Sequence, residues 1–271
     1  MNLFLFSIII FNLIKKGEKY IMQDFIAEDG ISKEILNSAK LLQAVQVNAL
    51  ILGNTGAGKK SLAKYILPNS TIYDAKDLQK DINDDVILIQ NEAIVIDKIN
   101  EITNIDMFLK WLENNNIRVI AISNTENLNQ KLKDIFSINL EIPNLSKREE
   151  DTKALINKFS QEASSILDLP IIPPSKLIIN ISSNTHSLRK SIYFSYLFET
   201  IGEHEILMFL EKYISENLQG ENSYKDLSYI FEVPLLKAST KKYKSQVQVA
   251  KHLGLNRITL RKKLEIYKDL L

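Results

Sequence analysis

The 271-residue chain contains no cysteine and only three histidines, His186, His204 and His252. Without cysteine it can form no disulfide, no thiolate metal site and no cysteine nucleophile. The histidines are too scattered in the sequence to indicate a metal cluster. No apolar run reaches the roughly 20 residues that a membrane-spanning helix needs. We therefore expect a cytoplasmic protein with no membrane partner.

Residues 3–14 form an apolar stretch that only Ser7 and Asn12 interrupt. Its positive charges follow it, whereas those of a secretory signal peptide precede the apolar part. A membrane anchor is one interpretation of this stretch. A second follows from residues 16–18, Lys-Gly-Glu, which AT-rich codons can write as a ribosome-binding sequence just before Met22. Our hypothesis is that translation starts at Met22 and that residues 1–21 are an untranslated extension.

Opposite charges almost cancel over the whole chain, with 34 Lys and Arg against 33 Asp and Glu. The composition, 45% hydrophobic and 25% charged, is average for a folded globular protein and excludes a largely disordered one. However, residues 233–271 contain ten basic and two acidic residues, so this segment carries a net charge of +8 and the rest carries −7. A basic segment of this kind indicates a nucleic-acid-binding part joined to an acidic body.

A glycine-rich segment follows residues 47–52, which have the apolar pattern of a buried strand. Gly53, Gly58 and Lys59 complete the pattern Gly-x-x-x-x-Gly-Lys, and a helical pattern comes next. Such a loop wraps an anion with backbone N–H groups, while its lysine reaches the β- and γ-phosphates of a nucleotide. The alternative is a chance glycine-rich turn between a strand and a helix.

The residue after the lysine is normally serine or threonine, but here it is Lys60, and Ser61 comes one position late. The predicted nucleotide contacts are Gly53, Asn54, Thr55, Gly56, Ala57, Gly58, Lys59, Lys60, Ser61 and Asn124.

Further apolar segments at residues 93–99, 118–123 and 138–142 alternate with helical patterns, which predicts a parallel sheet covered on both faces. Ligands of such sheets bind at the carboxyl ends of the strands, where the loop, Asp97 and Asn124 fall. Asp97 is the predicted Mg²⁺ ligand, although a strand-end acid can also simply cap a turn. Lys98 follows it, and a protonated lysine cannot act as a base.

These motifs resemble NtrC-type, sigma-54-dependent transcription activators over about residues 40–200. The loop at 53–60 is similar to the Walker A motif of that family, and residues 117–124 are similar to its sensor I strand. Residues 142–151 resemble the segment that leads into the helical lid, and residues 184–188 stand at the sensor II motif. The resemblance implies an α/β AAA+ P-loop domain at 22–146, a helical lid at 147–205, and ATP or ADP with Mg²⁺ as cofactor.

Four departures from that family concern ATP turnover and polymerase remodelling. Lys98 replaces the Walker B glutamate, His186 replaces the sensor II arginine, and residues 134–137 contain no arginine finger. The sigma-contacting loop Gly-Ala-Phe-Thr-Gly-Ala is absent from the sequence. We expect a degenerate AAA+ domain that makes no contact with sigma-54 polymerase, and we assign no catalytic residue. A slow ATPase that assembles into a ring is the alternative.

The last segment has two helical patterns, at residues 245–253 and from Asn256 onward, separated by Gly254. Glycine permits the tight turn between them, and asparagine is a good N-cap for the second helix. Leu260, Leu264 and Tyr267 form the inner stripe of that helix, and its basic residues lie outside the stripe. This pattern predicts a helix-turn-helix with a basic recognition helix; a solvated basic face on a helical bundle is the alternative.

Residues 226–268 resemble the nucleoid protein Fis and the Fis-type domain of the same activators. The resemblance implies an all-α DNA-binding domain at 224–271, after a connecting helix and linker at 206–223. It also implies a homodimer or higher homo-oligomer on double-stranded DNA. The DNA contacts implied are Asn256, Arg257, Thr259, Arg261 and Lys262.

We expect Arg257 to read a base and Arg261 and Lys262 to contact phosphates. The whole chain is thus predicted to be a cytoplasmic bacterial transcription regulator that binds specific DNA sequences. A Fis-like architectural protein of the nucleoid, with a purely structural α/β domain, is the remaining alternative.

Overall fold

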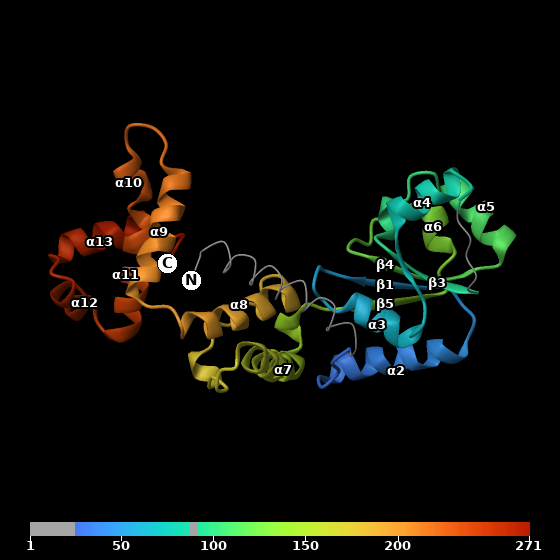
Figure 1. The fold of residues 1–271 in the computed structure, drawn as a ribbon, viewed down its shortest axis with the longest axis horizontal. Coiled ribbons are helices and arrows are strands. Elements are labelled where there is room, and N and C mark those ends of the chain that lie inside the picture. Colours follow the sequence, from blue (N-terminus) through green and yellow to red (C-terminus); the bar gives the residue numbers. More distant parts are fainter. Residues whose placement is uncertain (1–24, 87–91) are drawn as a thin grey trace. The chain divides into compact units, whose positions relative to one another are not determined.

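The structure is a computed structural model that describes residues 25–86 and 92–271 (Figure 1). The predicted extension at residues 1–21 and the predicted start at Met22 lie outside the described residues. The chain divides into two compact units, Met1–Thr200 and Ile201–Leu271. No helix among the described residues is long and apolar enough to cross a membrane.

The first unit contains a parallel sheet with strand order β2-β3-β4-β1-β5. The strands are β1 (Ala49–Gly53), β2 (Ile72–Asp74), β3 (Ala93–Asp97), β4 (Arg118–Ser123) and β5 (Ile138–Ile142). The parallel sheet predicted from four apolar segments is confirmed, and these segments are β1, β3, β4 and β5. The strand β2 was not predicted, because its three residues are only half-buried and show no apolar run.

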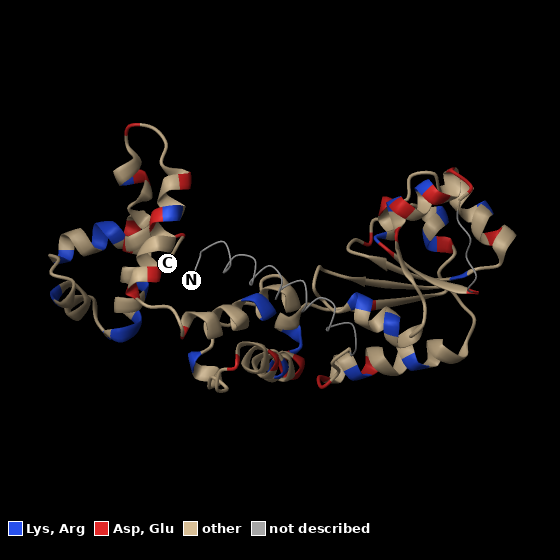
Figure 2. Cartoon of the chain, viewed as in Figure 1, with Lys and Arg blue, Asp and Glu red and all other residues tan. Residues whose placement is uncertain are grey.

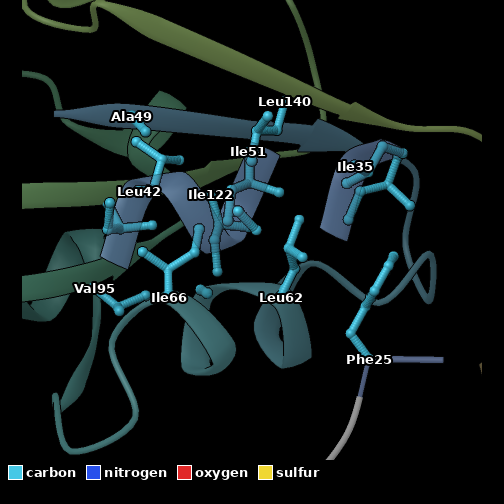
Figure 3. Packing of buried hydrophobic residues seen from close by; sticks show 14 of the residues in the cluster. Phe25, Ile35, Leu42, Ala49, Ile51, Leu62, Ile66, Val95, Ile122 and Leu140 are labelled. Atoms are coloured by element: carbon cyan, nitrogen blue, oxygen red, sulfur yellow. The ribbon is translucent and has the colours of Figure 1, made fainter. Parts of the chain in front are cut away.

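Helices cover both faces of this sheet, as a sheet with apolar residues on both faces requires. They are α2 (Gly30–Ala44), α3 (Lys59–Ile66), α4 (Ala75–Asn83), α5 (Ile105–Asn115) and α6 (Gln130–Asp134). Successive strand residues point to opposite faces, so Val95 packs with α2 and α3 while Ile94 and Ile96 join the cluster that includes α4 and α5. Figure 3 shows the first of these clusters, with Leu62 and Ile66 of α3 beside Ile122.

Two further helices, α7 (Glu149–Leu167) and α8 (Asn184–Phe198), form the helical part that follows the sheet. They pack against each other through a buried cluster that includes Phe159, Leu188 and Tyr196. The phenol of Tyr196 is fully buried and accepts a hydrogen bond from the Ile172 amide at 3.0 Å. Of the aromatic residues of α8, Tyr196 lies in this core, whereas Phe194 and Phe198 are about half exposed.

The second unit is entirely helical, with α9 (Glu203–Asn217), α10 (Ser223–Leu227), α11 (Tyr229–Lys242), α12 (Gln246–His252) and α13 (Arg257–Ile266). Its buried core consists of Leu236, Val249, Ala250 and Leu260. The turn between α12 and α13 places Gly254 at a φ of 65°, in the left-handed region that favours glycine. Asn256 then caps α13, because its side chain accepts a hydrogen bond from the Thr259 amide at 2.7 Å.

Candidate phosphate-binding loop and basic helix

The glycine-rich loop connects the end of β1 to the start of α3 at the carboxyl edge of the sheet. Gly56 and Gly58 have φ values of 76° and 106°, which L-residues with side chains rarely adopt. Within the described part of the chain, the amides of Gly58, Lys59 and Lys60 donate to no protein acceptor. Free amides at the start of a helix form a concavity that favours an anion.

Lys59 is the first residue of α3 and is nearly buried, with 7% of its surface exposed. Its ammonium group donates to the carbonyl oxygens of Gly53 at 2.6 Å and Asn54 at 2.8 Å, and to Asn124 Oδ1 at 2.7 Å. Burial lowers the pKa of Lys59 from 10.5 to about 8. An ammonium group has three N–H donors, so a phosphate that binds Lys59 has to replace one of these three acceptors.

Two further lysines at this edge pair with carboxylates. Lys60 Nζ lies 2.8 Å from Asp97 Oδ2, and Asp97 is the residue predicted to bind Mg²⁺. Lys98 Nζ lies 2.8 Å from Asp74 Oδ2, and this hydrogen bond lowers the pKa of Asp74 and raises that of Lys98. The position expected to hold a water-activating glutamate therefore presents an ammonium group.

The outer side of the loop is held by residues that follow the sheet. Asn184 Nδ2 donates to the Thr55 carbonyl at 2.9 Å, and Thr185 donates to the Gly56 carbonyl from both its amide, at 3.1 Å, and its hydroxyl, at 2.7 Å. Arg148 Nη2 donates to the Ala57 carbonyl at 2.8 Å. The C=O and N–H of one trans peptide point in opposite directions, so the Gly58 amide points away from the Arg148 guanidinium that binds the Ala57 carbonyl.

The contact between the loop and the start of α8 is close. A Cβ atom on Gly56 would lie 2.5 Å from the Ser183 carbonyl oxygen, a distance that no side chain tolerates. Glycine at this position therefore allows the two segments to touch as well as permitting the backbone turn.

A buried polar network around Arg148 and Asp151 also contacts the phosphate loop. Arg148 is 2% exposed and its Nη1 lies 3.2 Å from Oδ2 of the fully buried Asp151. Asp151 also accepts hydrogen bonds from the amides of Glu28 at 2.6 Å and Asp29 at 2.8 Å, and from the Ser32 hydroxyl at 2.5 Å. The first turn of α7 is thus tied both to the phosphate loop and to the start of α2.

Four of the ten predicted nucleotide contacts meet at the Lys59 ammonium group. Gly53, Asn54 and Asn124 surround the Lys59 ammonium, and a cavity of about 170 Å³ opens beside them, lined in part by Glu126, Asn144 and Lys147. Ser61 is half-buried and makes no side-chain hydrogen bond to any described residue.

The sequence reasoning missed Arg148, Asn184 and Thr185 as partners of the loop. The resemblance of residues 142–151 and 184–188 to the lid and sensor II segments of NtrC-type activators could have pointed to them. His186, in the same segment, is exposed.

The predicted DNA contacts lie on α13 and its cap. Asn256, Arg257, Arg261 and Lys262 are exposed, and Thr259 is half-buried. Across residues 25–86 and 92–271, none of Arg257, Arg261 and Lys262 forms an ion pair, whereas Lys263 pairs with Glu232 of α11 at 2.5 Å. Figure 2 marks the basic residues of α11, α12 and α13 in blue. The first two turns of α13 therefore present unpaired positive charge.

An apolar residue missed by the sequence reasoning lies on this surface. Ile258 is 70% exposed and stands between Arg257 and Thr259. The helical spacing that placed Leu260 on the inner face also places Ile258 and Lys262 on the outer face, which could have identified it. Ile258 therefore adds an apolar side chain to the exposed face of α13.

No protein-family model matches the chain, and no curated protein matches it. Among solved structures, NtrX from Brucella abortus in complex with ADP is similar, with 12% identity and a TM-score of 0.55 over 94% of this chain and 72% of NtrX. The same protein in complex with ATP matches with 13% identity and a TM-score of 0.54 over the same shares. RuvB from Thermotoga maritima matches with 17% identity and a TM-score of 0.42 over 88% of this chain and 85% of RuvB. The two NtrX structures show that the chain shares the fold of that protein.

Proposed function

We propose that the protein is a transcription regulator that binds specific double-stranded DNA through α13. The observation that carries this proposal is the unpaired, exposed charge of Arg257, Arg261 and Lys262 on the helix that follows the Gly254 turn. An arginine fork can pair with guanine in the major groove, and basic side chains beside it can contact phosphates.

The way α13 is held supports this function. Its inner face packs through Leu260 onto Leu236, Val249 and Ala250, and Lys263 is tied to Glu232. The opposite face, with Ile258 and Lys262, is left to solvent. A helix fixed along one side and basic on the other is the arrangement of a Fis-type helix-turn-helix, in which the start of the second helix reads base edges.

The helix α9 supports a dimer. None of its residues is buried, although Ile206, Leu207, Leu210 and Ile214 are apolar and recur along one side. A second copy of the same unit would cover this side. In the proposed dimer the two copies of α13 bind half-sites about one DNA turn apart, as helix-turn-helix dimers do.

Nucleotide acts in this proposal as a bound ligand of the loop. Support comes from the free amides at the start of α3, the nearly buried Lys59 beneath them, and a fold shared with a protein that was solved with ADP and with ATP. Turnover is not proposed, because Lys98 stands where the base would be and its ammonium group pairs with Asp74. Contact with sigma-54 polymerase is not proposed either, since the contacting loop is missing from the sequence.

DNA binding is tested by selecting bound fragments from sheared bacterial DNA and then titrating a selected fragment by fluorescence anisotropy. Arg261→Ala should weaken binding about tenfold or more, the loss of one charge-assisted phosphate contact. Lys225→Ala is the matched control, because it removes the same charge from an exposed position of α10, in the same unit but outside α9 and α13. Equal losses in both variants would contradict the assignment of α13, and selection of no fragment at all would contradict DNA binding.

Nucleotide binding is tested by calorimetric titration of the full chain with ADP, for which Lys59→Ala should abolish the heat signal. Steady ATP hydrolysis that disappears in Lys59→Ala would favour the slow ATPase instead. Genome-wide occupancy spread evenly rather than confined to a few promoters would favour an architectural role.

A further inference from the structure

A lysine from the chain itself lies where a phosphate loop ordinarily provides ligands for Mg²⁺. Lys60 takes the position of the usual serine or threonine, and its ammonium group lies 2.8 Å from Asp97 Oδ2. Asp97 is only 13% exposed, while Lys60 is 57% exposed and can therefore face an arriving ligand. One side chain thus both removes a hydroxyl ligand and engages the remaining carboxylate.

These residues do not fit Mg²⁺. The ion requires octahedral oxygen coordination at about 2.0–2.1 Å, and protein sites usually supply one or two carboxylates for it. Lys60 offers no oxygen, and its positive charge repels a second cation at the same carboxylate.

We propose that the phosphate loop binds a nucleoside diphosphate or triphosphate without a divalent cation, and that Lys60 serves as the cation of the site. In an ordinary site, removal of Mg²⁺ leaves a bare carboxylate beside the phosphates, and the two repel each other. Here Lys60 neutralises Asp97 whether metal is present or not. Lys59 and the free amides at the start of α3 then remain available to the phosphates.

The charges of Lys59, Lys60 and Asp97 also disfavour a divalent cation at this site. The pKa of Lys59 is lowered chiefly by burial, is raised by Asp97 and is lowered by Lys60. The charges of Lys59, Lys60 and Asp97 therefore interact with one another. Two ammonium groups and one carboxylate give the three side chains a net charge of +1. Addition of Mg²⁺ would bring two further positive charges next to two ammonium groups.

This inference rests on the nucleotide binding proposed above, and the experiment separates the two. The full chain is titrated with ADP in excess EDTA and again in excess Mg²⁺. We expect the two dissociation constants to agree within about threefold. Binding that requires Mg²⁺ would overturn this inference and leave nucleotide binding intact, whereas the absence of binding in both buffers would overturn both.

The variant Lys60→Ser restores a hydroxyl and frees Asp97. It should make ADP binding depend on Mg²⁺, with affinity in EDTA at least about tenfold weaker than in Mg²⁺. Lys40→Ser, at an exposed position of α2, is the matched control and should keep the behaviour of the unaltered chain. If Lys60→Ser binds ADP equally well in both buffers, Lys60 is not the cation of the site.

A direct readout of the metal complements the titrations. Electron paramagnetic resonance with Mn²⁺ and ADP should show no protein-bound Mn²⁺ for the unaltered chain but should show it for Lys60→Ser. The double variant Lys60→Ser, Asp97→Asn should lose that signal again. Bound Mn²⁺ in the unaltered chain would overturn the proposal.

Discussion

The guanidinium group of Arg148 donates a hydrogen bond to the carbonyl oxygen of Ala57 at 2.8 Å. Its other arm contacts the buried carboxylate of Asp151, so one side chain joins the phosphate loop to the first turn of α7. The Nε atom of Arg148 is buried and has no partner among the described residues. The guanidinium group of Arg148 is therefore buried, and its polar contacts are made by its two terminal nitrogens.

Replacement of Arg148 by alanine should strongly destabilise the first unit. It leaves the fully buried Asp151 without its ion-pair partner, and loss of one partner of such a pair costs about 3–5 kcal/mol. Urea unfolding followed by circular dichroism measures the change in the free energy of unfolding. Lys153→Ala is the control on the same helix, because Lys153 pairs with Glu149 and Glu150 in solvent and should leave the midpoint unchanged. Similar midpoints for both variants would show that the buried pair is dispensable.

Nucleotide affinity should fall as the pH rises above 8. In the free chain the pKa of Lys59 is lowered to about 8 by burial, and a bound phosphate raises it because the charged form is then stabilised. Above pH 8 the ligand therefore has to draw in a proton, and the association constant drops by up to about tenfold per pH unit. Calorimetric titrations with ADP between pH 7 and 9.5, in buffers of different ionisation enthalpy, report both the affinity and the proton uptake. Constant affinity without proton uptake would place the Lys59 pKa well above this range.

Arg257→Ala should reduce specific DNA binding by roughly 1–3 kcal/mol and relax the preference at one base pair. The side chain is exposed at the first position of α13, where a recognition helix meets base edges. A set of single-base variants of a selected fragment, titrated with both proteins, measures this preference. An unchanged preference pattern would move base reading to another residue of α13.

Lys262→Ala should weaken binding to all sequences alike. Its charge contributes to phosphate contact, so the slope of log affinity against log salt should become shallower by about one unit. Binding constants at several salt concentrations, for a selected and an unrelated fragment, give both slopes. A larger loss for the selected fragment than for the unrelated one would assign base contact to Lys262 as well.

Local patterns were sufficient to predict much of the sheet and of the last two helices. The strands β4 and β5 begin and end where their apolar runs do, and Asn256 and Gly254 have the roles that their residue types predicted. By contrast, β2 is a three-residue strand stabilised by pairing with β3, and such pairing leaves no mark on a short sequence. The apolar face of α9 was not predicted either, although the helical spacing of Ile206, Leu210 and Ile214 is visible in the sequence.

The arrangement of side chains at the loop was harder to predict than its backbone. Lys60 and Asp97 were both placed at the carboxyl edge, but the strands before them are separated in the sheet by β4. Whether two such side chains meet depends on distances across that edge, which no spacing encodes. Asn184 holds the Thr55 carbonyl from 129 positions further along the chain, so this contact follows from tertiary packing alone.

The hydrogen bonds of Asn184 and Thr185 attach the start of α8 to the backbone of the phosphate loop. Both residues lie in the first turn of a helix of 15 residues, which is about 22 Å long. Two residues, Glu199 and Thr200, separate its last residue, Phe198, from the second unit. The loop is therefore fixed to a helix whose residues Leu188 and Tyr196 lie in the buried core shared with α7, so the backbone of the phosphate loop and the packing of α7 against α8 depend on each other.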